Sequence, residues 1–196
     1  AFVDLKRQNR LHRTQYLTAV RRVIHDADFI LGQDLSRFET AFAKFCGTKY
    51  CVGLNSGTDA LEFGLRAYGI GAGDEVITAP NSYFSTAMVI TKVGARPVFA
   101  DINPDTYTLD PDKTAIAITP KTKAIMMAHT LGNPMPLDGI MELVTKHKLW
   151  FIEDCCDALG STYNGKLVST FGHVATFSFY PAHQITMGEG GAVVTS

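Results

Sequence analysis

The sequence contains few cysteines, and no two of them form a CxxC pair. They are Cys46, Cys51, Cys155 and Cys156. The adjacent pair is poorly placed for a mutual disulfide, and a metal site made only from these four thiols is not indicated. The pattern therefore predicts buried, reduced thiols in a cytoplasmic protein.

The sequence also lacks the marks of membrane or nucleic-acid binding. No stretch reaches the ~18 uninterrupted apolar residues typical of a membrane-spanning helix, and the first ten residues contain no apolar signal core. The formal net charge is -1, so neither a basic nucleic-acid surface nor an acidic disordered tail is indicated. We therefore expect a globular protein with neither a membrane nor a nucleic acid as partner.

The remaining sequence predicts two parts, a helical segment over residues 1–46 and an α/β domain over residues 47–196. Apolar residues recur at helical spacing twice in the first part, and Gly47 suits the end of the second helix. The first set is Tyr16, Leu17, Val20, Val23 and Ile24, and the second is Leu35, Phe38, Phe42 and Phe45. The chain lacks an initiator Met and stops in a strand-like run, so we expect it to be a fragment.

After residue 47, short apolar runs alternate with amphipathic segments. Such alternation predicts a mostly parallel sheet with helices on both faces. Ligands bind such sheets at the carboxyl ends of the strands, so chemistry should gather in the loops that follow them. The expected strands are 50–54, 75–79, 97–101, 123–128, 149–153, 174–179 and 192–195, with helices near 59–68, 83–93, 111–118 and 137–147 and an irregular stretch at 154–173.

Two of these loops carry groups that suit a flat, phosphorylated ligand. In Asn55-Ser56-Gly57-Thr58-Asp59-Ala60, the glycine allows a tight turn, and the following amides open a helix that can bind a phosphate. After the next strand, Tyr83 could stack on a flat ring. Each motif alone also fits a structural role. The first could be a plain strand–helix turn with Ser56 or Thr58 as N-cap, and in the second Tyr83 and Phe84 could be core residues that open the next helix.

Two later loops supply acid–base groups. The run Trp150–Asp157 ends a hydrophobic strand in acids, and Asp154 is a candidate to pair with a protonated ring nitrogen. Ser178 closes another strand, and His183 follows it as a candidate acid–base group. A surface cap at Asp154 and a structural histidine at His183 are the alternatives when each motif is taken alone.

In this order, the motifs resemble the DegT/DnrJ/EryC1/StrS sugar aminotransferase family of fold-type-I pyridoxal-phosphate enzymes. Phe2–Lys6, Phe29–Gly32, Gly73–Ile77 and Pro97–Ile102 also resemble family segments. The resemblance implies the large domain of that fold without its C-terminal small domain, and a homodimer. It implies that Gly57, Thr58 and Ser178 hold the cofactor phosphate, that Tyr83 stacks on the pyridine ring, that Asp154 binds its nitrogen, and that Asp157 stands where many members have Gln.

One position departs from the family pattern. Ordinary members place the cofactor-binding Lys five residues after the serine, and here that residue is His183. An imidazole keeps a base but cannot form a stable Schiff base. The nearest lysine, Lys166, lies on a different loop. The departure favours pyridoxamine phosphate, or a noncovalent pyridoxal phosphate, as the cofactor.

Long runs further resemble the family branch that dehydrates CDP-4-keto-6-deoxyglucose at C3. They are Ala128–Pro134, Ile152–Gly165 and Phe177–His183. The resemblance implies C3 dehydration of a nucleotide-linked 4-keto-6-deoxyhexose, a CDP-sugar first of all, in deoxysugar and lipopolysaccharide O-antigen biosynthesis. A [2Fe-2S] cluster on cysteines beyond residue 196, with a flavin or iron–sulfur reductase, or else glutamate, would complete turnover. A nucleotide-sugar aminotransferase and a catalytically degenerate cofactor-binding member are the alternatives.

Overall fold

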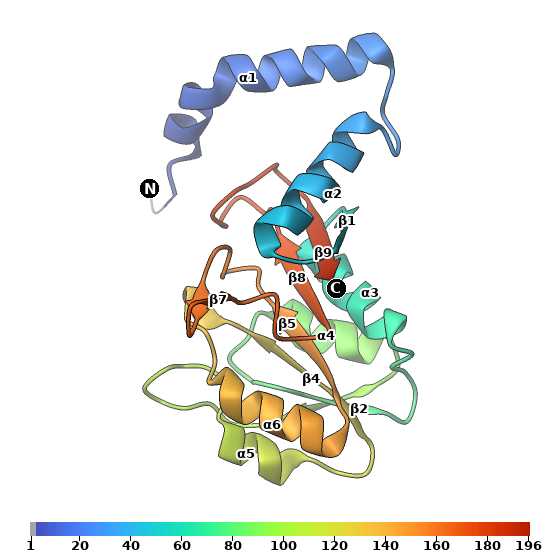
Figure 1. The fold of residues 1–196 in the computed structure, drawn as a ribbon, viewed down its shortest axis with the longest axis vertical. Coiled ribbons are helices and arrows are strands. Elements are labelled where there is room, and N and C mark those ends of the chain that lie inside the picture. Colours follow the sequence, from blue (N-terminus) through green and yellow to red (C-terminus); the bar gives the residue numbers. More distant parts are fainter. Residues whose placement is uncertain (1–2) are drawn as a thin grey trace.

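The computed structural model describes residues 3–196, so the opening Phe2 of the family-like N-terminal segment lies outside the described residues. Helix α1 (Leu5–Asp26) begins where Asp4 accepts a hydrogen bond from the backbone N–H of Arg7 at 3.0 Å. None of its residues is buried, and Figure 1 shows α1 extending away from the body of the fold. The apolar face predicted for this helix is therefore largely exposed.

Helix α2 (Gln33–Cys46) packs against the sheet through its aromatic side chains. The Phe42 ring meets those of Phe177 and Phe179 edge-on, with centroids 5.0 and 5.4 Å apart. Gly47 ends the helix in the left-handed conformation, as predicted, and its N–H bonds to the last-turn carbonyls. The first 46 residues thus contribute to the core of the α/β part, and the division after residue 46 stays a prediction.

Seven strands form one sheet in the order β1-β9-β8-β5-β4-β2-β3. Among the described residues, β9 is the one strand of this sheet that runs opposite to the other six, so the predicted mostly parallel sheet is confirmed. The strands are β1 (Tyr50–Leu54), β2 (Glu75–Thr78), β3 (Arg96–Phe99), β4 (Thr122–Ala128), β5 (Trp150–Asp154), β8 (Val174–Ser178) and β9 (Gly191–Thr195).

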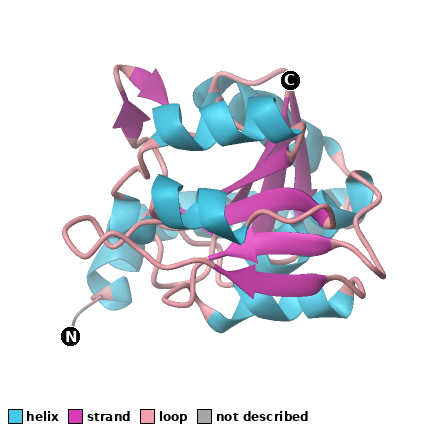
Figure 2. Ribbon diagram, turned by 90° about the horizontal axis from the view of Figure 1, so that it is seen from below, coloured by secondary structure: helices cyan, strands magenta, loops and turns pink. Residues whose placement is uncertain are grey.

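Helices cover both faces of the sheet, as Figure 2 shows. The central strand β4 explains why, since its buried residues alternate between the two sides. The helices are α3 (Gly57–Ala67), α4 (Phe84–Lys92), α5 (Pro111–Ala117), α6 (Leu137–His147) and the short 3₁₀ turn η1 (Thr130–Gly132). Ala124 and Met126 belong to the cluster that contains α3 and α4 residues, while Ile125 and Met127 belong to the cluster that contains α2 and α6 residues.

The stretch predicted to be irregular, residues 154–173, consists of turns around a small hairpin of β6 (Thr162–Tyr163) and β7 (Lys166–Leu167). In residues 3–196, no helix has the length and apolar character needed to cross a bilayer. Because all strands of the main sheet except β9 point the same way, the loops that leave their carboxyl ends meet at one edge.

Candidate active site

A cavity of about 510 Å³ opens at that edge of the sheet. Its walls come from the loops that follow β1, β2, β4, β5 and β8, so segments far apart in the sequence share it. Each site residue named from the sequence lines this cavity: Gly57, Thr58, Tyr83, Asp154, Asp157, Ser178 and His183.

The first wall of the cavity is the N-terminus of α3. Ser56 is the N-cap, and its Oγ accepts a hydrogen bond from the N–H of Asp59 at 3.1 Å. The N–H groups of Gly57 and Thr58 precede the first intrahelical bond, so they remain available to an anion at the positive end of the helix. The turn therefore has the Ser56 cap that a purely structural role requires, and its free amides also suit a phosphate.

Gly57 is required by the close approach of α3 to the end of β8. A Cβ at this position would lie 2.6 Å from Ser178 Cβ and 3.1 Å from Cys156 Sγ. We expect Gly57→Ala to destabilise the protein by about 1–3 kcal/mol and to weaken phosphate binding, because α3 must move away from the cavity. Urea unfolding and cofactor titration would measure the two effects.

Gly64→Ala is the matched control on the same helix. Its Cβ would first meet Val174 Cγ1 at 3.5 Å, which is ordinary van der Waals contact. Alanine also favours a helix interior over glycine by up to about 1 kcal/mol. If Gly57→Ala proved as stable as Gly64→Ala, the close approach would not constrain this turn.

Asp154 ends β5 as a buried carboxylate. One of its oxygens accepts a hydrogen bond from the backbone N–H of Cys156 at 3.1 Å. Within residues 3–196, no basic side chain makes an ion pair with it. Burial raises the pKa of Asp154, and the hydrogen bond from Cys156 opposes this only in part. The surface-cap alternative is wrong, and the site suits a cationic ligand atom that would stabilise the carboxylate.

Tyr83 and Ser178 both line the cavity. Tyr83 precedes α4 with 79% of its surface exposed, and Phe84 is similarly open, so the reading of these aromatics as core residues is wrong. Ser178 Oγ accepts a hydrogen bond from the N–H of Tyr180 at 3.3 Å. A ring bound in the cavity would therefore meet both an exposed aromatic side chain and a hydroxyl.

Some cavity residues were not predicted from the sequence. Ser85 lies on α4, and its Oγ is 2.9 Å from Thr58 Oγ1, so the two hydroxyls position each other. Tyr180 lies two residues after Ser178, with its ring centroid 6.4 Å from that of His183. A serine in the first turn of α4 was a signal for Ser85, whereas nothing in the spacing indicated Tyr180.

His183 and Asp157 lie side by side although they belong to different loops. The Nδ1 atom of His183 is 3.0 Å from Asp157 Oδ1, and the histidine side chain is mostly buried. Gln184 ties the same loops together, since its Nε2 donates to the carbonyl of Asp157 at 2.6 Å. The structure thus gives Asp157 a contact with His183 that the sequence did not predict.

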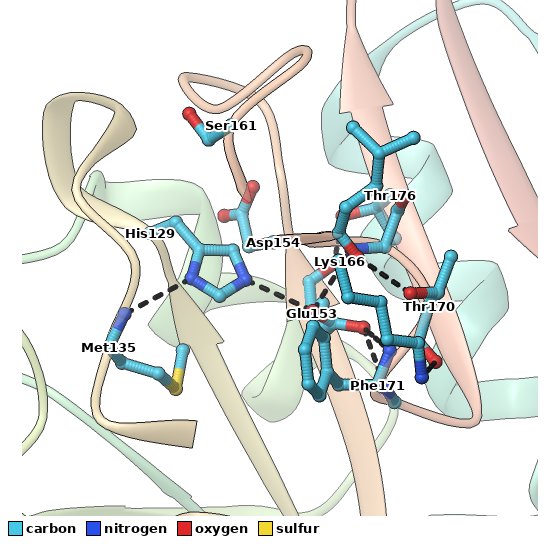
Figure 3. Close-up of polar contacts among 12 residues, drawn as sticks. His129, Met135, Glu153, Asp154, Ser161, Lys166, Thr170, Phe171 and Thr176 are labelled. Atoms are coloured by element: carbon cyan, nitrogen blue, oxygen red, sulfur yellow. Dashed lines mark hydrogen bonds and ion pairs between the residues drawn. The ribbon is translucent and has the colours of Figure 1, made fainter. Parts of the chain in front are cut away.

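No lysine lines the cavity within the part of the chain that the structure describes. Lys166, the lysine nearest to His183 in sequence, donates instead to the carbonyl of Thr170 at 3.1 Å and lies 4.5 Å from the centre of the Phe171 ring. Figure 3 shows this arrangement.

A second polar cluster, His129, Glu153 and Cys155, lies buried beside β5 and has metal-binding residue types. The side-chain polar atoms of His129 and Glu153 are already paired. Glu153 accepts hydrogen bonds from the N–H groups of Ser169 and Gly172, and its Oε2 is 3.1 Å from His129 Nε2. Because the second nitrogen of His129 accepts from a backbone N–H, this group serves to hold the loops around Asp154 (Figure 3).

Together, the cavity contains a helix N-terminus, an exposed aromatic ring, a buried carboxylate with no basic partner and an imidazole. These groups fit pyridoxal or pyridoxamine phosphate, which carries a phosphate on a flat ring with a basic nitrogen. The fold and the cavity define an α/β protein of the class that uses this cofactor. The chain belongs to the DegT/DnrJ/EryC1/StrS aminotransferase family, whose family model matches residues 11–196.

Similar proteins include both transaminases and a dehydratase. The chain is 40% identical over 195 residues to dTDP-3-amino-3,4,6-trideoxy-alpha-D-glucose transaminase of Streptomyces venezuelae, covering 99% of this chain and 52% of that protein. It is 45% identical over 172 residues to dTDP-4-dehydro-2,6-dideoxy-D-glucose 3-dehydratase of Saccharopolyspora spinosa, covering 84% of this chain and 37% of that protein.

The fold agrees with a solved structure along its whole length. The X-ray structure of S. venezuelae DesV in complex with a ketimine intermediate superposes with a TM-score of 0.96 at 41% identity, covering 100% of this chain and 53% of that one. The predicted fold of a pyridoxal-phosphate-dependent transferase is therefore confirmed. The chain spans about half the length of this structure and of the transaminase above.

Proposed function

We propose that this chain is the cofactor-binding part of an enzyme that removes the C3 hydroxyl of a nucleotide-linked 4-keto-6-deoxyhexose, with pyridoxamine phosphate as cofactor. One observation carries the proposal: His183 lines the cavity, and no lysine among the described residues does. An imidazole can accept and return a proton, but it cannot hold the cofactor through a stable Schiff base.

The residues on the cavity wall would hold the cofactor without a covalent bond. The amides of Gly57 and Thr58 and the hydroxyl of Ser178 would bind the phosphate, and Tyr83 would cover the ring. The Asp154 carboxylate would pair with the ring nitrogen and keep it protonated. When bound, the cofactor supplies an amine that condenses with a ketone and a ring that accepts electrons.

His183 is the residue that we expect to move protons. Asp157 faces its Nδ1 at 3.0 Å, which favours the tautomer with hydrogen on Nδ1 and leaves Nε2 free. Nε2 would take a proton from the C4′ carbon of the cofactor and then deliver it to the departing C3 hydroxyl. Because no described residue of the cavity offers a lysine amine that could release an amino product, the site would favour dehydration over transamination.

A nucleotide-sugar aminotransferase is the second candidate, and the relatives favour it. The Streptomyces venezuelae transaminase matches 99% of this chain at 40% identity. The lack of a cavity lysine among residues 3–196 speaks against it. A catalytically degenerate member is a weaker candidate, because Tyr83, Asp154 and His183 all line one cavity together with the α3 N-terminus.

We also propose finer features of the function. They are a CDP-linked sugar as substrate, a homodimer, a cytoplasmic location and a role in deoxysugar or lipopolysaccharide biosynthesis. We further propose a [2Fe-2S] cluster on cysteines beyond residue 196 and a reductase partner. The four cysteines of the chain are free thiols, and burial raises the pKa of Cys46 to about 12, as expected for a reduced, unreactive thiol.

Product analysis with the full-length protein tests the two main candidates. The enzyme would be incubated with pyridoxamine phosphate and CDP-, dTDP-, UDP- or GDP-linked 4-keto-6-deoxyhexoses, with and without glutamate or a reductase. Loss of the C3 oxygen from the sugar is the expected result. A stable amino sugar formed from glutamate, together with a borohydride-reducible lysine link to the cofactor, would identify a transaminase instead.

A further inference from the structure

The loop that follows β3 presents an aromatic side chain under backbone strain. Tyr107 has a φ of 57°, in the left-handed region, yet 61% of its surface is exposed. A bulky residue in this conformation costs roughly 1–2 kcal/mol relative to the right-handed one. Such strain persists only where the surrounding structure enforces it, and it is frequent at ligand sites.

Two side chains from the cavity wall hold Tyr107 in place. Its carbonyl accepts hydrogen bonds from Asn81 Nδ2 and Thr130 Oγ1, each at 3.0 Å. Its N–H donates to the carbonyl of Asn103 at 2.9 Å. Asn81 and Thr130 both line the cavity, so the Tyr107 backbone lies one side chain away from it. The backbone that carries the exposed ring is thus fixed to the rim of the site.

The adjoining turn repeats this arrangement. Leu131 has a φ of 52° and is 88% exposed, directly after Thr130, which bonds to Tyr107. Asn133 Nδ2 also donates to the carbonyl of Thr106 at 3.0 Å, so the two turns are joined twice. On the other side, Ser161 Oγ donates to the carbonyl of Gly132 at 2.8 Å, which connects the turn to the loop that carries Asp157.

We propose that Tyr107, flanked by Leu131, is the platform on which the base of the nucleotide-linked substrate stacks. The inference rests on the proposed function only in taking the substrate to be a nucleotide-linked sugar. Once the ketone lies beside His183, the nucleotide must extend past the cavity wall and over its rim. An exposed aromatic ring whose backbone is anchored there offers a flat face to any base, whichever nucleotide the enzyme uses.

Nucleotide binding to the full-length protein loaded with pyridoxamine phosphate tests this platform. CDP, dTDP, UDP and GDP would each be titrated by calorimetry into the wild type and into Tyr107→Asn and Tyr107→Phe. Asparagine tolerates the left-handed conformation, so the loop keeps its shape while the ring is lost. For the diphosphate that binds, we expect Tyr107→Asn to raise the Kd about tenfold and Tyr107→Phe to change it less than twofold.

Controls separate stacking from other effects. Ile116→Ala removes an apolar side chain on α5 that is even more exposed than Tyr107, and it should leave the Kd unchanged. An unchanged Kd in Tyr107→Asn, equal weakening in both tyrosine variants, or no binding of any diphosphate to the wild type would each overturn the proposal. The assay involves no sugar chemistry, so its outcome is independent of whether the enzyme dehydrates or transaminates its substrate.

Discussion

Replacing His183 with alanine is expected to slow exchange of the C4′ proton of bound pyridoxamine phosphate by about 10²–10⁴-fold, the usual contribution of a positioned general base. The imidazole lines the cavity and contacts Asp157, so its removal deletes the proton acceptor without opening the core. Cofactor affinity should stay close to that of the wild type, since the phosphate and ring nitrogen keep their own partners. Deuterium uptake at C4′, followed by NMR, measures the effect.

Two further variants make this result specific. His147→Ala changes an exposed histidine at the end of α6 and should leave exchange at the wild-type rate. Asp157→Asn should give a smaller loss than His183→Ala, because the imidazole remains while the contact that orients it is weakened. Wild-type exchange in His183→Ala would show that another group removes the proton, and the dehydration proposal would lose its base.

The sequence allowed the sheet and the cavity residues to be predicted because their signals are local. β4 reads as a continuous apolar run since both of its faces are buried, and Gly57 stands where only a residue without Cβ fits. Because the carboxyl ends of parallel strands meet at one edge of the sheet, the predicted strand ends also indicated where polar site residues would gather. The structure shows that Asp154 and Ser178 are the last residues of neighbouring parallel strands, a strand order that the sequence did not predict.

Contacts between loops could not be predicted in this way. Asp157 and His183 lie 3.0 Å apart only because Gln184 and the intervening turns bring two loops together, and no spacing rule encodes such an approach. The strained backbone of Tyr107 is enforced by Asn81 and Thr130, which belong to other loops. The apolar face of α1 was visible in the sequence, but its periodicity does not indicate which surface, if any, covers it.

Asp154→Asn is expected to have opposite effects in the presence and absence of cofactor. Burial raises the pKa of Asp154, so the folded protein binds more protons than the unfolded chain between about pH 4, the unperturbed value, and the raised folded value. Stability contributed by this group therefore falls as the pH rises through that window. Without cofactor, Asp154→Asn should not show this loss. Its free energy of unfolding, measured against that of the wild type at the same pH, should therefore be higher at pH 7 than at pH 4.

With pyridoxamine phosphate bound, the order of stability should reverse, so that the wild type is more stable than Asp154→Asn. At about 100 times its Kd, a ligand that binds only the folded state adds about 2.7 kcal/mol to the free energy of unfolding. The neutral amide cannot hold a protonated ring nitrogen, so Asp154→Asn should gain much less, and turnover should drop about 10²–10³-fold, as when one preorganised electrostatic group is lost. Asp105→Asn, at an exposed carboxylate, is the control for thermal unfolding at both pH values. Equal stabilisation of the wild type and Asp154→Asn by the cofactor would mean that the Asp154 carboxylate does not meet the ring.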